Sequence, residues 1–228
     1  MPNLLIEIGN TALKAAWSEG LTLGKTYRYQ GEKKTEFILS LIEKEKPAGM
    51  VIASVYDIPA GEERKIRKAC PQLLVLDPSH SSFLDKYGLP DHLTFDRASS
   101  LIAVRHLFEG KSCTLMDFGT TLTVDFLDAD GKYCGGNVSL GLRTRFKAIG
   151  RYSKARHLQS SVDDGIYSGI MFEIQGYIDS KPENIVVFTG GDAIYFAKRM
   201  KNSIFVVCNL TLMGLALITE DYVQENAR

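Results

Sequence analysis

The sequence lacks an excess of charge of either sign. Among 228 residues, 27 Lys and Arg balance 27 Asp and Glu, so the formal net charge is zero. Proteins whose main partner is nucleic acid or an anionic membrane usually carry a basic surface, so we expect neither partner. The sequence also lacks an apolar run of membrane-spanning length and a leading basic segment followed by an apolar one. We therefore expect a cytoplasmic protein.

Cysteine is scarce, and no two cysteines form a C-x-x-C pair, which argues against a zinc site. Cys113 and Cys208 lie in apolar, strand-like runs, where we expect them to pack as small core residues with reduced thiols. Apolar residues make up 45% of the chain and charged residues 24%, a normal globular mixture. The length is enough for one large domain or two of ordinary size.

The hydrophobic pattern of the first half alternates between strands and helices. Two apolar runs, 3–9 and 12–17, are separated by Gly-Asn-Thr. We expect a hairpin there, because Gly and Asn tolerate the positive φ of a tight turn. Residues 32–46 carry apolar side chains at helical spacing, with charges on the other face. The expected strands are 3–9, 12–17, 21–29, 48–57 and 73–76, and the expected helices are 61–69, 32–46 and about 98–110.

The same order of elements returns in the second half. Residues 112–141 give a strand that ends in an acid, a Gly-Thr-Thr turn, a second strand, an Asp-Gly turn and a third strand. Further expected helices cover 142–150, 163–178 and 210–225, and further expected strands lie within 184–200 and 203–209.

Such an internal repeat constrains the fold more than any single motif. We expect an α/β protein with two βββαβαβ-type halves and a cleft between them. The expected domains are an N-terminal half, 1–109, and a C-terminal half, 110–228. The sequence shows no linker rich in Pro or Ser between them.

Each half opens with a carboxylate at the end of a strand and a turn of small polar residues: Glu7 with Gly-Asn-Thr, and Asp117 with Gly-Thr-Thr. Turn amides and hydroxyls can bind phosphate oxygens, glycine lets the backbone approach a ligand, and a carboxylate can hold a metal directly or through water. One such turn would be an ordinary hairpin with an acid at its edge. Two copies favour phosphate binding.

Other polar residues allow two interpretations each. Lys14 either reaches the phosphates or is an outward-facing strand lysine. Asp96 either caps a helix or takes a proton from a substrate hydroxyl, with Arg97 holding an anionic group. The Thr-Gly-Gly-Asp turn at 189–192 follows a strand and opens a helix, which suits a nucleotide only weakly.

Together these motifs resemble the type III pantothenate kinases, which belong to the actin-like superfamily that also contains acetate and sugar kinases. "EIGNTALK" resembles Asp-x-Gly-Asn-Thr-x-x-Lys, "LTFDR" resembles Leu-Gly-x-Asp-Arg, and "DFGTTLTVD" resembles Asp-x-Gly-Thr-Ala-x-Thr-x-Asp. "GGNVSLG", "FTGGDA" and "NLTLMGL" resemble later motifs, so the likeness runs along nearly the whole chain in the family's order.

The resemblance implies a duplicated actin-like (ribonuclease H-like) fold, a homodimer, and Mg-ATP-dependent phosphorylation of pantothenate, the first step of coenzyme A synthesis. It also implies a monovalent cation, K⁺ or NH₄⁺, bound by Asp117. Asp96 would be the proton acceptor. The implied pantothenate-binding residues are Tyr87, Thr94, Phe95, Asp96 and Arg97. The implied ATP-binding residues are Glu7, Ile8, Gly9, Asn10, Thr11, Ala12, Leu13, Lys14 and Thr120.

The sequence departs from the family's motifs at several positions. Glu7 replaces Asp, Thr94 replaces the Gly of Gly-x-Asp-Arg, and Leu140 replaces the Pro before Gly141. Catalytic geometry is sensitive to shifts of about an ångström, which the extra methylene of Glu7 introduces. The alternative function is therefore a regulator or nucleotide-binding module, without catalysis or with another task, on the same fold.

Overall fold

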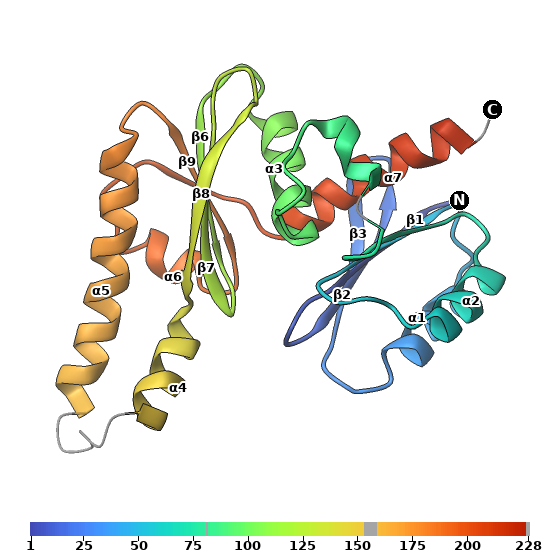
Figure 1. The fold of residues 1–228 in the computed structure, drawn as a ribbon, viewed down its shortest axis with the longest axis horizontal. Coiled ribbons are helices and arrows are strands. Elements are labelled where there is room, and N and C mark those ends of the chain that lie inside the picture. Colours follow the sequence, from blue (N-terminus) through green and yellow to red (C-terminus); the bar gives the residue numbers. More distant parts are fainter. Residues whose placement is uncertain (81, 153–158, 227–228) are drawn as a thin grey trace. The chain divides into compact units, whose positions relative to one another are not determined.

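The computed structural model describes residues 1–80, 82–152 and 159–226. Its first sheet has five strands in the order β3-β2-β1-β4-β5. β1 pairs antiparallel with β2, β2 pairs antiparallel with β3, and β4 and β5 run parallel to β1 (Figure 1). The strands are β1 (Asn3–Ile8), β2 (Leu13–Glu19), β3 (Thr22–Tyr29), β4 (Met50–Ser54) and β5 (Leu73–Leu76).

The second sheet repeats this topology. Its order is β10-β9-β6-β7-β8, with β6, β7 and β8 antiparallel and β9 and β10 parallel to β6. The strands are β6 (Cys113–Phe118), β7 (Thr121–Leu127), β8 (Tyr133–Leu140), β9 (Ile185–Gly190) and β10 (Ile204–Val206). The predicted duplication of a βββαβαβ unit is confirmed.

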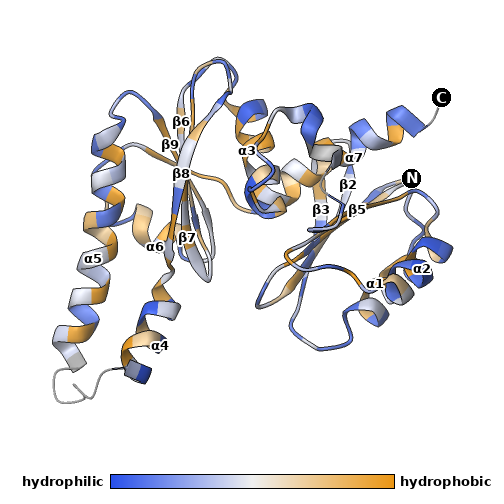
Figure 2. Cartoon of the chain, viewed as in Figure 1, coloured by the Kyte–Doolittle hydropathy of each residue, from blue (hydrophilic) through white to orange (hydrophobic). Residues whose placement is uncertain are grey.

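Two helices cover one face of the first sheet, α1 (Lys34–Lys44) and α2 (Ala60–Ala69). They share a core cluster with alternate residues of β1, such as Leu4 and Ile6, because successive strand residues face opposite sides. In α2 only Ile66 is buried, and the rest of that helix is largely hydrophilic in Figure 2. A 3₁₀ helix that the pattern did not predict, η1 (Ser82–Tyr87), precedes α3 (Phe95–Leu107).

The second sheet is covered by α5 (Gln159–Ser180), whose buried isoleucines recur every four residues and so lie on one face. These are Ile166, Ile170, Ile174 and Ile178. The shorter helices of this part of the chain are α4 (Leu142–Tyr152) and α6 (Ala193–Ala197). The chain ends with α7 (Leu210–Asn226).

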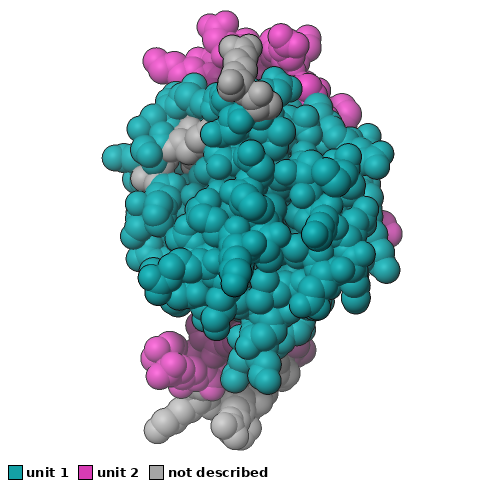
Figure 3. Space-filling model, turned by 90° about the vertical axis from the view of Figure 1, so that its right-hand side faces the viewer, with its two compact units in different colours: residues 1–103, 210–228 teal, residues 104–209 magenta. Residues whose placement is uncertain are grey.

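The chain forms two compact units. The first contains residues 1–103 and 210–228, and the second contains residues 104–209 (Figure 3). The helix α7 therefore belongs to the first unit, where it packs against β1 and β4, although it follows the second sheet in sequence. The units differ in this respect from the expected domains, 1–109 and 110–228.

Close packing of α7 against α3 sets the position of the latter. A Cβ atom added to Gly214 of α7 would lie 1.8 Å from the carbonyl oxygen of Ser99. Ser100 and Thr211 are joined by a buried hydrogen bond of 3.1 Å between their hydroxyls. Only glycine at position 214 allows the two helix backbones to come this near.

Two details of the predictions were wrong. Gly9 and Asn10 do not have positive φ, so the hairpin between β1 and β2 forms without the left-handed conformation we expected. Cys113 is buried as predicted, but Cys208 is exposed, because it lies after the end of β10. Among the described residues, none of the helices is long and apolar enough to cross a membrane.

Candidate active site

The first predicted phosphate turn connects β1 to β2, and an ion pair closes its base. Glu7 and Lys14 are directly opposite in the antiparallel register. The Lys14 ammonium donates to both carboxylate oxygens of Glu7, at 3.2 and 3.1 Å. Glu7 is 14% exposed and Lys14 is 42% exposed, so the carboxylate is the more enclosed partner. The turn itself closes with a hydrogen bond of 3.0 Å from Gly9 N–H to the Ala12 carbonyl.

The environment of Glu7 disfavours its charged form. Burial raises the pKa of the Glu7 carboxyl above its usual value, and the nearby ammonium of Lys14 partly opposes this effect. The carboxylate of Asp96 raises the pKa of Glu7 further by like-charge repulsion. The fold therefore brings Glu7, from the first strand, near Asp96, from a helix about ninety positions later in the sequence.

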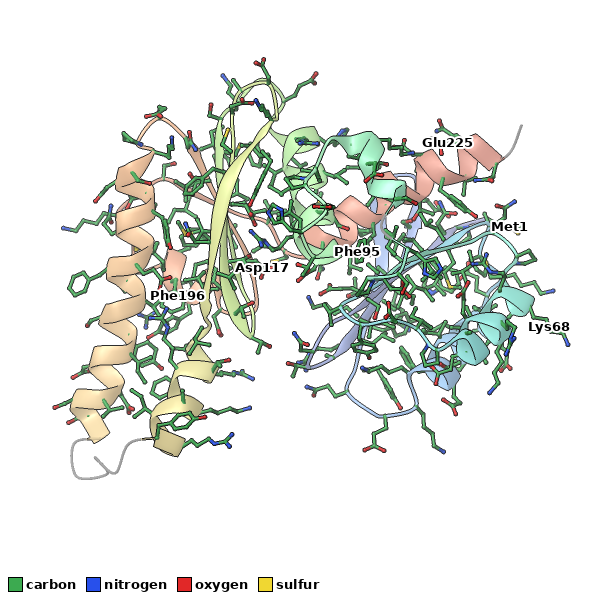
Figure 4. All side chains as sticks on the ribbon, viewed as in Figure 1. Met1, Lys68, Phe95, Asp117, Phe196 and Glu225 are labelled. Atoms are coloured by element: carbon green, nitrogen blue, oxygen red, sulfur yellow. The ribbon has the colours of Figure 1, made fainter. Side chains whose placement is uncertain are left out.

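Asp96 is the second residue of α3, which begins at Phe95 (labelled in Figure 4), three residues earlier than predicted. The carbonyl of Thr94 accepts the first helical hydrogen bond, from Ala98 N–H at 2.9 Å. Thr94 thus takes the N-cap position, at which threonine is favoured, and Asp96 does not. Asp96 Oδ1 is buried and has no hydrogen-bond partner among the described residues. Such an atom is costly unless a ligand satisfies it.

Three of the other predicted substrate residues lie at the start of the same helix, and Tyr87 lies before it in the chain, at the end of η1. Phe95 is buried, Arg97 is half-buried and Thr94 is exposed. Tyr87, at the end of η1, donates its hydroxyl to Asp221 of α7 at 2.5 Å. Asp221 carries no sequence motif, so the sequence offered no signal that would have identified it.

The second predicted phosphate turn connects β6 to β7. Asp117 is half-buried near the end of β6, and Thr120 is exposed in the turn. This turn closes with a hydrogen bond of 2.9 Å from Gly119 N–H to the Thr121 carbonyl. The corresponding bond of the first turn spans one residue more, so the two turns are similar but not identical.

The start of α4 packs against this second turn. Gly141 N–H and the Thr144 hydroxyl both donate to the Thr120 carbonyl, at 3.0 and 2.6 Å. A Cβ atom on Gly141 would lie 2.2 Å from the Gly119 carbonyl oxygen, so the glycine allows these two backbone segments to approach closely. Sequence reasoning did not select Thr144. Thr144 could have been identified from its position one helical turn after Gly141.

Gly190 packs against the carboxylate of Asp117, which Figure 4 labels. Its φ is +92°, and a Cβ atom there would lie 2.4 Å from Asp117 Oδ1. The Thr-Gly-Gly turn therefore serves close strand packing. The helix after it, α6, has only five residues, and Asp192 makes no side-chain cap.

A cavity of about 310 Å³ in the second unit contains none of these residues. It lies at the start of β6 and the end of β7, between Cys113, Leu127 and Arg105. Asp117 and Thr121 are at the opposite ends of the same two strands. Within the part of the chain that the structure describes, no group of three or more His, Cys, Asp or Glu residues could hold a metal ion by itself.

Solved structures with this architecture define the class. The activator of the 2-hydroxyisocaproyl-CoA dehydratase from Clostridium difficile, solved with bound ADPNP, matches with a TM-score of 0.61 and 15% identity over 100% of this chain and 97% of its own. A ROK hexokinase from Thermus thermophilus matches with a TM-score of 0.51 and 12% identity, over 96% and 98% of the two chains. The fold is that of the actin-like ATPases and sugar kinases.

Sequence comparison identifies the family. The family model for type III pantothenate kinase matches residues 3–180. The type III pantothenate kinase of Bacteroides fragilis (strain YCH46) is 30% identical over 233 residues, which cover 93% of this chain and 95% of the relative. That of Christiangramia forsetii is 31% identical over 240 residues, covering 96% and 98%. The chain belongs to the type III pantothenate kinase family, whose members are kinases, and a kinase uses ATP with a divalent metal ion.

Proposed function

We propose that this protein catalyses the ATP-dependent phosphorylation of pantothenate to 4'-phosphopantothenate, the first step of coenzyme A synthesis. The observation that carries the proposal is Asp96 Oδ1, a buried carboxylate oxygen without a partner among the described residues. A substrate hydroxyl bound there would satisfy this atom and place its proton on a general base. Membership of the family supplies the identity of the acceptor.

In this mechanism Asp96 orients the primary alcohol of pantothenate and accepts its proton. The alcohol oxygen forms its bond to the γ-phosphorus of ATP as the bond to ADP breaks, in line. The position of Asp96 in the first turn of α3 supports this role, because the helix N-terminus favours a carboxylate there and fixes its direction. Arg97 pairs with the substrate carboxylate or a phosphate oxygen, and Tyr87, Thr94 and Phe95 complete the pantothenate site.

We assign ATP binding to the first turn, residues 7–14, and to Thr120. Glu7 fits a magnesium nucleotide, since Mg²⁺ is usually held by one or two carboxylates together with substrate phosphates. When bound, magnesium neutralises charge on the transferring phosphoryl group. We assign the monovalent cation, K⁺ or NH₄⁺, to Asp117, whose half-buried carboxylate supports this role. Turn amides and the Thr120 hydroxyl bind phosphate oxygens.

The proposal extends to the assembly and the compartment. We propose a homodimer, as the resemblance to the family implies, and a cytoplasmic location, because the reaction draws on cellular ATP. We also keep the division into halves at 109 and 110 as a proposal about the evolutionary repeat, distinct from the compact units.

The test is ADP release from Mg-ATP with and without pantothenate, at varied potassium, for the wild type and for Asp96→Asn. We expect release that depends on pantothenate, and a loss of about 10²-fold or more in the variant with ATP binding retained. ADP release that does not depend on pantothenate would contradict the proposal that pantothenate is the substrate. Full activity of Asp96→Asn would contradict the catalytic base.

A second candidate is a nucleotide-binding module without catalysis. The ion pair between Glu7 and Lys14 favours it, because Lys14 already contacts both carboxylate oxygens at the turn expected to receive phosphate. The same assay separates the two functions: binding of ATP by the wild type without turnover would support the module.

A further inference from the structure

Tyr87 and Asp221 are 134 positions apart in the sequence, and the fold joins them by a hydrogen bond. Tyr87 ends η1 and Asp221 lies on α7, both within the first unit. The phenol oxygen of Tyr87 donates to Oδ2 of Asp221 at 2.5 Å. This distance is typical of a hydroxyl that donates to an ionised carboxylate, which is the stronger kind of hydrogen bond.

A lysine next to the pair keeps a cation near the Asp221 carboxylate. Lys86 Nζ lies 3.9 Å from Asp221 Oδ2, 2.8 Å from Glu225 Oε1 and 5.2 Å from the centre of the Tyr87 ring. Burial raises the pKa of the Tyr87 phenol, and the hydrogen bond and charge of Asp221 raise it further. The phenol therefore keeps its proton throughout the physiological range.

A phenol has one proton to donate, and its oxygen otherwise only accepts hydrogen bonds. Because Asp221 takes the proton of Tyr87, the oxygen can interact with another group as an acceptor. A carboxylate offers no donor to such an atom, whereas an amide N–H or a hydroxyl does.

We propose that Asp221 is a positioning residue that makes Tyr87 a hydrogen-bond acceptor toward the substrate, so that Tyr87 recognises a donor group rather than the carboxylate. This inference rests on the proposed function and deepens it. The donor groups of pantothenate other than the reacting alcohol are its amide N–H and its secondary hydroxyl. The C-terminal helix α7 thereby takes part in substrate selection through Asp221.

The experiment compares Asp221→Leu, Asp221→Asn, Tyr87→Phe and the double variant Tyr87→Phe with Asp221→Leu. Glu225→Gln is the matched control, because Glu225 lies on the same helix as Asp221, and its 2.8 Å contact is to Lys86 rather than to the Tyr87 hydroxyl. The measurements are kcat and the separate KM values for pantothenate and ATP.

We expect Asp221→Leu to raise the pantothenate KM by about five- to tenfold, with kcat and the ATP KM within about twofold of the wild type. Asp221→Asn keeps an acceptor oxygen and should recover most of this loss. In the Tyr87→Phe background, Asp221→Leu should raise the pantothenate KM hardly any further, because Asp221 acts through the Tyr87 hydroxyl, which this background lacks. Additive losses, or equal losses in kcat and in both KM values, would show a merely structural role and overturn the proposal.

Substrate analogues test the direction of the hydrogen bond. One analogue is an ester that replaces the amide N–H, and the other lacks the secondary hydroxyl. The analogue without the recognised donor should bind the wild type several-fold more weakly than pantothenate does. It should bind Tyr87→Phe about as tightly as pantothenate binds that variant. Either analogue behaving this way supports the proposal and identifies the donor. If both analogues lose as much affinity in Tyr87→Phe as in the wild type, Tyr87 does not recognise a donor.

Failure of the proposed function has a separate signature, which is absence of pantothenate-dependent turnover in the wild type. The positioning claim is then tested by NMR of protein labelled with ¹³C at the tyrosine ζ carbons. The Tyr87 signal, identified by its loss in Tyr87→Phe, should shift clearly in Asp221→Leu and much less in Glu225→Gln, because Glu225 acts on Tyr87 only through its charge. An unchanged signal in Asp221→Leu would overturn the pairing itself.

Discussion

Lys14 and Glu7 face each other across the first hairpin, and the ammonium of Lys14 lies 3.1 Å from Oε2 of Glu7. Burial nevertheless holds the pKa of Glu7 above its usual value, and Asp96 adds to the shift. The pair therefore compensates only part of the cost of placing a carboxylate at this turn. Sites that bind phosphate and metal commonly keep such a cost in the free protein.

Glu7→Gln should stabilise the free protein at neutral pH. A carboxyl whose pKa is raised in the folded state contributes stability below its unfolded pKa and loses that contribution as pH rises through the folded pKa. The amide does not titrate, so the variant should unfold at a higher temperature than the wild type at pH 7. The difference should shrink as the pH falls through the raised pKa of the folded protein, and it should be gone below about 4.5, the ordinary value for glutamate.

Thermal unfolding of both proteins across this pH range checks the sign. A variant that is less stable at pH 7 would show that the ion pair with Lys14 outweighs burial. The same variant should lose about tenfold or more in kcat/KM for ATP, since the carboxylate belongs to the proposed magnesium nucleotide site.

Gly214→Ala should destabilise the protein, by about 1–3 kcal/mol or more, because the new methyl group would overlap the Ser99 carbonyl. Relief requires α3 to move away from α7, and Asp96 moves with it. We therefore expect kcat to fall together with stability. Chemical denaturation and steady-state kinetics measure the two effects.

Gly176→Ala provides the matched control. Gly176 lies within α5, and a Cβ atom there meets no atom within 4 Å. Alanine is the better helix former by up to about 1 kcal/mol, so this variant should be as stable as the wild type or more stable. Equal destabilisation of both variants would refute the steric explanation at Gly214.

Thr144→Val should weaken ATP binding while it preserves the volume of the side chain. The valine cannot donate to the Thr120 carbonyl, and the hydrogen bond of 2.6 Å is lost. We expect the ATP KM to rise by about two- to tenfold, the range that one hydrogen bond supports. Thr144→Ser retains the hydroxyl and should bind ATP nearly as well as the wild type. Isothermal titration with a non-hydrolysable ATP analogue checks both, and equal affinities for all three proteins would contradict the role.

Gly190→Ala should raise the potassium concentration needed for half-maximal activity, because the methyl group would press on Asp117 Oδ1. Gly135→Ala separates this effect from backbone strain. Gly135 also has a positive φ, +99°, but a Cβ atom there meets nothing within 4 Å. Both variants should lose about 1 kcal/mol or more of stability, and only Gly190→Ala should change the potassium response. An identical potassium response in the two variants would remove Asp117 from the proposed cation site.

The sequence predicted the two turns of the candidate site but not the exact start of the helix that carries Asp96. The hairpin at Gly9 and the turn at Gly119 were predicted from local patterns, and both exist because short polar segments between apolar runs leave few alternatives. The helix with Asp96 was predicted too, but its start was placed at residue 98. Thr94 already serves as its N-cap, a role that the comparison of Thr94 with the family's glycine does not indicate.

The sequence by itself determined the elements, their repetition and the family, because periodicity and motif order are properties of neighbouring residues. Only the tertiary structure decided the burial of Glu7, its proximity to Asp96 and the return of α7 to the first unit. It also decided the contact between Tyr87 and Asp221, whose separation of 134 positions leaves no periodic trace. Such contacts depend on how sheets and helices bury their remaining apolar faces, which the spacing of residues along one element does not specify.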